Sequence, residues 1–145
     1  MINLRKVRPE DIDLLFKWAN DPVVRSNSFN IAPIPYENHI LWFNKMMDDP
    51  SVLQFILESD GLPIGQIRLN ITGSTAEIGY SIATEHRGNG YGHIILQMVI
   101  NEVKENYPDI KKVIARVKKD NAVSRRLFES EGYNTDYLCY SLEVN

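Results

Sequence analysis

Two kinds of hydrophobic pattern alternate along the chain. Alternation of apolar and polar residues with a period of two predicts strands over residues 2–8, 52–57, 63–71, 75–83, 111–117 and 133–144. Apolar residues spaced three and four positions apart predict helices over residues 9–19, 37–48, 90–106 and 121–131. The stretch 23–36 is mixed and rich in proline, and it is predicted as a loop or short turn.

Prolines, glycines and short polar runs mark the ends of these segments. Pro9 opens the first helix, and Pro22 stops it. Gly132 is expected in the left-handed conformation after the last helix. Turns at 59–61 and 72–74 join three successive strands into a meander. The order β-α-α-β-β-β-α-β-α-β predicts an α/β (α+β) fold with a mixed, largely antiparallel sheet and helices on both faces.

Composition narrows the class of protein. The 145 residues are 43% hydrophobic and 24% charged. They are expected to form one domain over 1–145 that buries a core without the help of a metal ion or a disulfide bond. The net charge of −3 argues against a nucleic-acid partner, because phosphate binding needs excess Lys and Arg. No signal core or membrane span is recognised, so we expect a cytoplasmic protein with no membrane partner, a monomer or homodimer.

Metal and disulfide chemistry are not expected. Cys139 is the only cysteine, which excludes an internal disulfide and a cysteine-based zinc cluster. No carboxylates or histidines stand at ligand spacing on a common face. The sequence therefore predicts a site built from backbone groups and ordinary polar side chains.

The most informative stretch joins the 75–83 strand to the 90–106 helix. Three of its residues are glycines, and the stretch reads Arg87, Gly88, Asn89, Gly90, Tyr91, Gly92. Glycines let the backbone approach a ligand closely, and the free N–H groups of a first helical turn attract anions. The spacing fits neither the dinucleotide fingerprint nor the P-loop. We interpret it as a phosphate site of another kind, the alternative being an ordinary strand-to-helix turn.

Two motifs carry a resemblance to a known family. Arg87-x-x-Gly90-x-Gly92 resembles the Q/R-x-x-G-x-G/A pyrophosphate motif of the GNAT family of N-acetyltransferases. Asn121-x-x-Ser124-x-x-Leu127-Phe128-x-x-x-Gly132-Tyr133 is similar to the family pattern N-x-x-[AS]-x-x-[LV]-[YF]-x-x-x-G-[FY]. The predicted order of elements is also that of the GNAT fold, so the resemblance covers the full chain. It implies an acetyl-coenzyme A-dependent N-acetyltransferase that acts on a primary amine of a small molecule.

The resemblance implies a set of coenzyme contacts. The pyrophosphate would lie on the amides between Arg87 and Gly92, and the pantetheine arm would meet the strand amides of Ile82 and Ala83. Asn121, in the second motif, is the other residue that the resemblance places at the coenzyme.

Glu77 is the candidate general base. Neutralising a lysine-like amine with a pKa of about 10.4 costs roughly 4–5 kcal/mol at pH 7, whereas an α-amine with a pKa of about 8 costs about 1.4 kcal/mol. Strand alternation places Glu77, Gly79 and Ser81 on one face. The resemblance implies that a glutamate on this strand acts as base directly or through water. The alternative is an exposed strand carboxylate.

The proton donor is less directly indicated. Many family members carry a tyrosine at the position of Phe128, where its hydroxyl protonates the leaving thiolate, and Phe128 has no such proton. A serine occurs at the position of Ser124 in the Rim-type branch, so Ser124 is the candidate acid. Its alternative role is hydrogen bonding at the helix start, with solvent as the proton source.

The acceptor is expected to contact the early segment 18–30, which is rich in hydrogen-bonding groups. Arg25 is a good partner for carboxylate or phosphate, and Asn27 and Phe29 accompany it. The segment resembles the Rim-like subgroup, and looks closest to enzymes acting on nucleotide-linked amino sugars, where Arg25 would meet the phosphates. Protein N-termini, polyamines and antibiotics are alternative acceptors. A catalytically weak coenzyme A-binding module is the rival class, and the glycine spacing disfavours a dinucleotide-dependent oxidoreductase.

Overall fold

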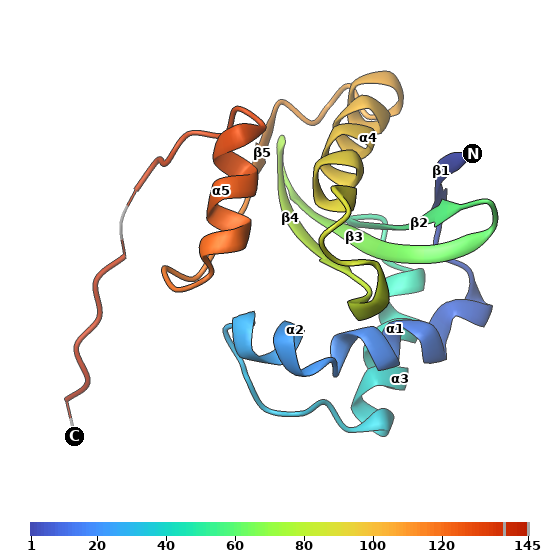
Figure 1. The fold of residues 1–145 in the computed structure, drawn as a ribbon, viewed down its shortest axis with the longest axis horizontal. Coiled ribbons are helices and arrows are strands. Elements are labelled where there is room, and N and C mark those ends of the chain that lie inside the picture. The colour runs from blue at the N-terminus through green and yellow to red at the C-terminus, as the bar shows by residue number, and fades with distance from the viewer. Residues whose placement is uncertain (138, 145) are drawn as a thin grey trace.

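A five-stranded sheet forms the centre of the protein (Figure 1), seen in a computed structural model that describes residues 1–137 and 139–144. Across the sheet the strands lie in the order β1 (Ile2–Lys6), β2 (Val52–Ser59), β3 (Leu62–Thr72), β4 (Thr75–Ile82) and β5 (Lys112–Ile114). Strands β1 to β4 pair antiparallel, and β5 runs parallel to β4. The predicted mixed, largely antiparallel sheet is confirmed.

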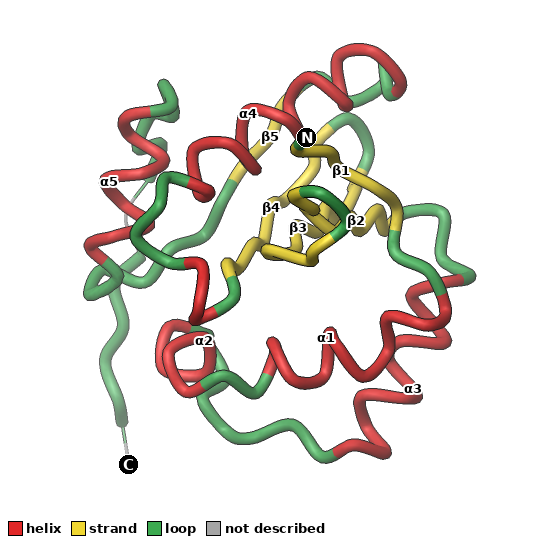
Figure 2. Tube along the Cα trace, turned by 45° about the vertical axis from the view of Figure 1, so that its right-hand side comes forward, coloured by secondary structure: helices red, strands yellow, loops and turns green. Residues whose placement is uncertain are grey.

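Helices cover both faces of the sheet, as predicted (Figure 2). One face carries α1 (Ile12–Ala19), α2 (Pro22–Asn27) and α3 (Tyr36–Met47), and the other carries α4 (Tyr91–Asn106) and α5 (Ala122–Ser130). Short 3₁₀ turns at Pro9–Asp11 and Thr84–His86 lead into α1 and toward α4. None of the helices in the described residues is long and apolar enough to cross a membrane.

Strand alternation divides the apolar side chains between two cores. Ile67, Leu69 and Ile78 face α4 and α5 and pack in one cluster with Val99 and Phe128. The second cluster lies under α1 and α3 and consists of Val7, Leu15, Trp18, Phe43, Met46, Ile56 and Ala83. Each fully buried aliphatic or aromatic side chain contributes about 1.5–3 kcal/mol. The sheet is therefore held from both sides.

The stretch predicted as a loop or short turn contains a helix. Asp21 caps α2 by accepting the N–H groups of Val23 and Val24 at 3.0 and 3.2 Å, and Pro22 occupies the first turn. Six residues are too few to show hydrophobic periodicity. The signal for this helix in the sequence was the capping residue Asp21 followed by Pro22. The strand predicted over residues 111–117 is shorter in the structure, where β5 spans only Lys112–Ile114.

The predicted last strand, 133–144, is wrong for the part that the structure describes. Residues 133–137 and 139–144 form no helix or strand, and position 138 lies outside the described residues. The side chains of Tyr137, Tyr140, Leu142 and Val144 are exposed. A strand is stabilised by pairing and by burial of one face, and alternation alone supplies neither.

Candidate active site

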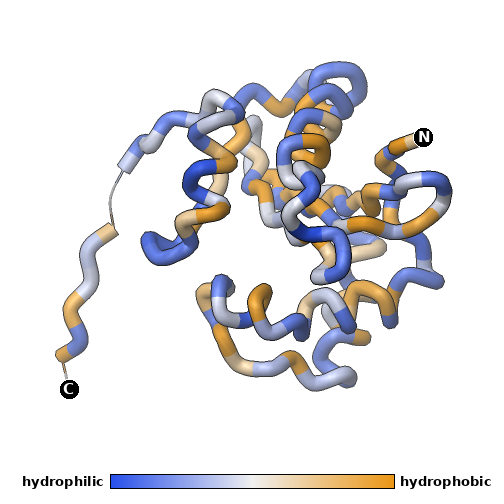
Figure 3. Tube along the Cα trace, viewed as in Figure 1, coloured by the Kyte–Doolittle hydropathy of each residue, from blue (hydrophilic) through white to orange (hydrophobic). Residues whose placement is uncertain are grey.

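The glycine-rich loop forms a cradle of backbone amides at the end of β4. Gly88 and Gly90 have φ values of +79° and +81°, and Gly90 is the N-cap of α4. Among the described residues, the N–H groups of Gly88, Asn89 and Gly90 have no backbone acceptor. This loop is hydrophilic (Figure 3). Free amides beside a helix N-terminus make a site suited to a phosphate or pyrophosphate.

Gly92 has a different role from the other two glycines. A Cβ atom at Gly92 would lie 2.9 Å from Cδ2 of Leu127, which is closer than real contacts allow. The absence of a side chain therefore lets α4 approach α5. The third glycine of the motif is explained by helix packing.

The side chain of Arg87 turns away from the amides of the loop. Its Nε donates to the carbonyl of Ile82 at 3.0 Å, and its Nη2 donates to the Asp21 carboxylate at 3.0 Å. The Thr84 hydroxyl also donates to Asp21. Burial raises the pKa of Asp21, but the bonds from Thr84 and Arg87 outweigh it and lower this pKa to about 2. The cluster ties the loop to the start of α2.

The outer edge of β4 is open where the coenzyme arm is expected. Strand β5 pairs only with Thr75–Glu77, so beyond these residues the described chain supplies no partner strand on this side. The Ala83 amide, expected at the pantetheine arm, donates instead to the Ile64 carbonyl at 2.9 Å on the β3 side. Because backbone groups alternate in direction along an antiparallel strand, Ile82 and Tyr80 direct theirs to the open edge. The Ala83 amide is therefore already bonded within the sheet, whereas the Ile82 amide is available at the open edge.

A cavity of about 480 Å³ lies on the face of the sheet that α1, α2 and α3 cover, between these helices and strands β2 to β4. Its lining includes Trp18, Arg25, Trp42, Gln66, Arg68 and Ser81. Gly79 lies in the interior of β4, is exposed, and has nothing within 4 Å of the place where a Cβ would be. Glycine in a strand interior marks close approach of another group. The cavity therefore reaches the β4 backbone at Gly79.

Polar side chains cross the floor of this cavity in a hydrogen-bonded row. Gln54 donates to Gln66 at 2.9 Å, and Gln66 donates to the Ser81 hydroxyl at 3.1 Å. The row spans β2, β3 and β4 and leaves the Ser81 O–H group free to donate into the cavity. Gln54, Gln66 and Arg68 are site features that the sequence analysis missed. It placed Gly79 and Ser81 on the face of Glu77 without giving them a role in binding. The signal was the set of polar residues alternating with buried ones on β3.

Glu77 lies on the same face of β4 as Gly79 and Ser81, as predicted. Its carboxylate accepts from Nε of Arg116 at 2.8 Å. The side chains of Glu77 and Arg116 are 31% and 57% exposed, so solvent screens this pair and it opens at low cost. Glu77 is not among the lining residues of the cavity. At about 7 Å along the strand from Gly79, it suits a base that acts through water.

Ser124 is paired with Tyr80, a residue to which the sequence analysis gave no role. Its hydroxyl and that of Tyr80 share a hydrogen bond of 2.8 Å. The Phe128 ring packs edge-on against the Tyr80 ring with centroids 5.8 Å apart, and so holds that tyrosine in place. The Ser124 N–H donates to the Asn121 side chain at 3.2 Å, so Asn121 caps α5. Two linked hydroxyls therefore lie beside Phe128, at the open edge of β4.

The three predicted acceptor residues are dispersed. Arg25 lines the cavity, but its guanidinium donates to the carbonyls of Ala19, Asn30 and Ala32 and to the Ser28 hydroxyl. Asn27 is exposed and is not among the lining residues. Phe29 is 64% exposed and lies under the Arg116 guanidinium, 5.4 Å from its ring centroid. Arg25 thus organises the α2–α3 connection with most of its donors.

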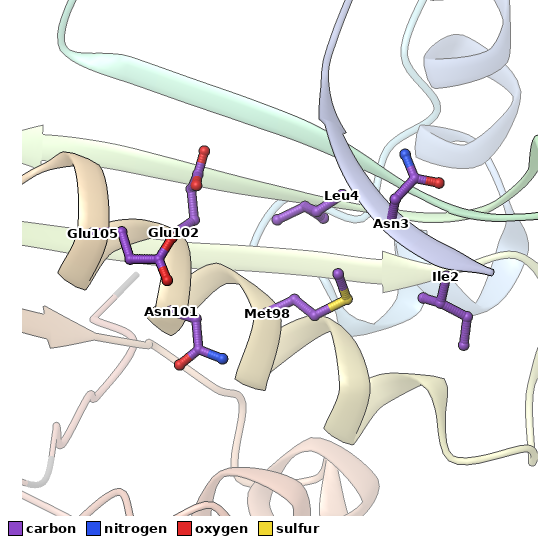
Figure 4. Close-up of a pocket in the computed structure, with 7 residues that line it drawn as sticks. All are labelled: Ile2, Asn3, Leu4, Met98, Asn101, Glu102 and Glu105. Atoms are coloured by element: carbon purple, nitrogen blue, oxygen red, sulfur yellow. The ribbon is translucent and has the colours of Figure 1, made fainter.

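A second, more open pocket of about 250 Å³ lies between β1 and α4 (Figure 4). Its lining consists of Ile2, Asn3 and Leu4 of β1 and of Met98, Asn101, Glu102 and Glu105 of α4. The glycine-rich loop contributes nothing to its lining. Among the described residues, no group of three or more His, Cys, Asp or Glu side chains is placed to hold a metal ion.

A sheet that is open beside β4, a cradle of backbone amides at the end of that strand and a cavity on one face of the sheet match the site that the resemblance implies, that of an acyl-coenzyme A-dependent transferase. Residues 2–134 match the model of the acetyltransferase (GNAT) domain, and the chain belongs to the GNAT family of acetyltransferases. It is an N-acetyltransferase that uses acetyl-coenzyme A as acyl donor.

Individual relatives are distant. The chain is 29% identical to acetyltransferase PseH of Campylobacter jejuni subsp. jejuni over 133 residues, which is 90% of this chain and 82% of that protein. The spermidine N-acetyltransferase of Vibrio cholerae, solved with coenzyme A and spermine, superposes with a TM-score of 0.85 at 21% identity over 99% of this chain and 88% of that one. The aminoglycoside acetyltransferase AAC(6')-Ib, solved with coenzyme A and kanamycin, gives 0.81 at 16% identity over 94% and 86%.

Proposed function

We propose that the chain acetylates a primary amine of a small molecule bound in the cavity beneath α1, α2 and α3. The observation that carries this proposal is the exposed backbone of Gly79, where the cavity meets β4. The open edge of β4 for the coenzyme arm and the cavity for the acceptor lie on either side of the same strand segment. A volume of about 480 Å³ falls within the usual range for small-molecule sites.

Among small-molecule acceptors we favour a nucleotide-linked amino sugar, as the resemblance to the Rim-like subgroup implies. The charged residues that line the cavity are Arg25 and Arg68, and no Asp or Glu of the described chain lines it. Polyamines and aminoglycosides are polycations, and two arginines without a carboxylate repel them.

The proposed mechanism assigns one step to each side of β4. Acetyl-coenzyme A supplies an activated acyl group, with its pyrophosphate on the amides of the glycine-rich loop. On the cavity side, Glu77 removes the amine proton through water once its surface pair with Arg116 opens. The amine nitrogen attacks the acyl carbon, the C–N bond forms and the C–S bond breaks. The nitrogen loses its second proton to water, and the leaving thiolate takes a proton from the hydroxyl pair of Tyr80 and Ser124, which water then restores.

A thiol-release assay over a panel of amines tests the proposal. The panel contains a nucleotide-linked 4-amino sugar, spermidine and N-terminal peptides, each with acetyl-coenzyme A. We expect turnover with the amino sugar and little with spermidine. Glu77→Gln should lower kcat more for an amine with a pKa of about 10 than for one of about 8, since only the first carries the full deprotonation cost. Stabilisation by coenzyme A without turnover of any amine would instead indicate a binding module.

A further inference from the structure

Arg68 lies at the centre of the cavity floor. It is on β3, with Gln54 of β2 and Gly79 of β4 as its register partners. Its side chain lines the cavity and carries the guanidinium away from the sheet toward α3. There the guanidinium carbon lies 5.3 Å from the ring centroid of Trp42.

The guanidinium of Arg68 lacks the acceptors that other arginines have. Its Nε atom is buried and has no hydrogen-bond partner, and none of its other donors has an acceptor among the residues that the structure describes. By contrast, Arg5 bonds to Asp11 and Glu58, and Arg87 bonds to Asp21 and a carbonyl. Buried donors without partners cost free energy, which a ligand that accepts from them recovers.

Arg68 is charged and oriented in spite of this lack of partners. Burial lowers the pKa of Arg68 and the nearby Glu77 charge raises it, but a guanidinium remains protonated at any ordinary pH. The Trp42 ring lies against the guanidinium, a cation–π contact that favours this position of the side chain in the cavity. A planar fork of N–H donors without partners matches a carboxylate or phosphate group.

We infer that Arg68, held against Trp42, is the anion-binding subsite for the acceptor, and that the acceptor is an amine that carries a negative charge. This inference rests on the proposed function and assigns the anion to Arg68, because most donors of Arg25 are already bonded to its own loop. The guanidinium lies beside Trp42 of α3, so the anion would bind on the α3 side of the cavity, apart from the β4 backbone where the amine is proposed to react.

The test compares charged and neutral acceptors in variants of Arg68. The charged acceptor is a nucleotide-linked 4-amino sugar, and the neutral one is the methyl glycoside of the same sugar. Arg68→Met keeps the length of the side chain and removes the charge, whereas Arg68→Lys keeps the charge without the fork. Arg126→Gln, which changes an exposed arginine on α5, is the matched control. A melting shift with coenzyme A confirms that each variant is folded.

We expect Arg68→Met to raise KM for the charged acceptor by about 10- to 100-fold, the usual size for loss of a charged hydrogen-bonding partner. The KM for the neutral acceptor and the kcat for both should change by less than about twofold. The KM of Arg68→Lys for the charged acceptor should lie between those of Arg68→Met and the wild type. The KM of Arg126→Gln should equal that of the wild type. Equal losses for both acceptors, or no loss, would overturn the inference.

A binding measurement separates failure of this inference from failure of the proposed function. Uridine diphosphate is titrated by calorimetry into protein saturated with coenzyme A, so that the glycine-rich loop is occupied. A dissociation constant that rises at least about tenfold in Arg68→Met supports the anion subsite, even if no amine is turned over. The same constant in both proteins, or no binding to the wild type, contradicts it. Absence of turnover with every amine counts against the proposed function alone.

Discussion

At the scale of single residues, we propose that Tyr80 and Ser124 together take the role of the tyrosine that position 128 lacks. Their hydroxyl oxygens lie 2.8 Å apart, so one donates to the other and one proton is left for the thiolate. Burial raises the pKa of Tyr80, which the bond to Ser124 partly offsets, and the phenol therefore stays protonated at neutral pH. Phe128 supports the Tyr80 ring rather than donating a proton.

Tyr80→Phe should lower kcat by about 10- to 100-fold with coenzyme affinity nearly unchanged, because the lost interaction forms in the transition state. Ser124→Ala should have a similar effect, and the double variant should be no worse than the poorer single, because the hydroxyls act as one unit. Tyr133→Phe is the matched control, a partly buried tyrosine against the other side of Phe128. Steady-state rates and coenzyme titrations measure these effects. Additive losses, or an equal loss in Tyr133→Phe, would assign the proton to another group.

At the scale of elements, the connection from β4 to α4 is proposed to bind the coenzyme through its backbone. Gly90→Val places a β-branched residue at φ +81°, which costs about 1–2 kcal/mol of stability and distorts the amides. Gly61→Val is the matched control, since Gly61 has φ +79° in the β2–β3 turn and equally open surroundings. Coenzyme A affinity, measured by calorimetry, should fall in Gly90→Val and stay constant in Gly61→Val. Equal affinities would remove this loop from the coenzyme site.

The cluster of Asp21, Thr84 and Arg87 joins the start of the glycine-rich loop to the N-terminus of α2. Because the folded pKa of Asp21 is about 2, below its usual 3.8, its contribution is complete above about pH 4 and is lost as pH falls toward 2. Asp21→Asn should lower the free energy of unfolding at pH 7 by about 1–2 kcal/mol, an amount reduced for partial solvent exposure. The difference in the free energy of unfolding between Asp21→Asn and the wild type, measured by fluorescence-monitored unfolding, should vanish near pH 2. A constant difference from pH 7 to 2 would show that the charge of Asp21 is not responsible.

At the scale of the whole molecule, one partly buried arginine links the N-terminal strand to the rest of the fold. Arg5 of β1 bonds Asp11 at 2.7 and 2.9 Å, just before α1, and Glu58 of β2 at 2.8 Å. Arg5→Met leaves the buried Asp11 carboxylate without its cation and should cost about 3–5 kcal/mol. Lys112→Met, which breaks an exposed pair with Asp136, should cost less than about 1 kcal/mol. Denaturant unfolding measures both, and similar losses would contradict the special role of Arg5.

The sequence by itself determined most helices and strands and the glycine-rich loop. Ile95, Val99 and Val103 repeat at helical spacing, and Gly88, Gly90 and Gly132 take the positive φ values that only glycine adopts without strain. Such features depend on neighbours within a few residues, so the local sequence is sufficient to predict them.

Only the tertiary structure decided the cavity beneath α1, α2 and α3 and the hydrogen bond between the Tyr80 and Ser124 hydroxyls. Tyr80 and Ser124 are 44 positions apart, and Arg68 meets Trp42 only because α3 packs over β3. The structure likewise showed that Arg25 serves its own loop and that Gly92 serves helix packing. Which donor finds which acceptor depends on how distant elements pack, and hydrophobic periodicity specifies a buried face without specifying the neighbour that covers it.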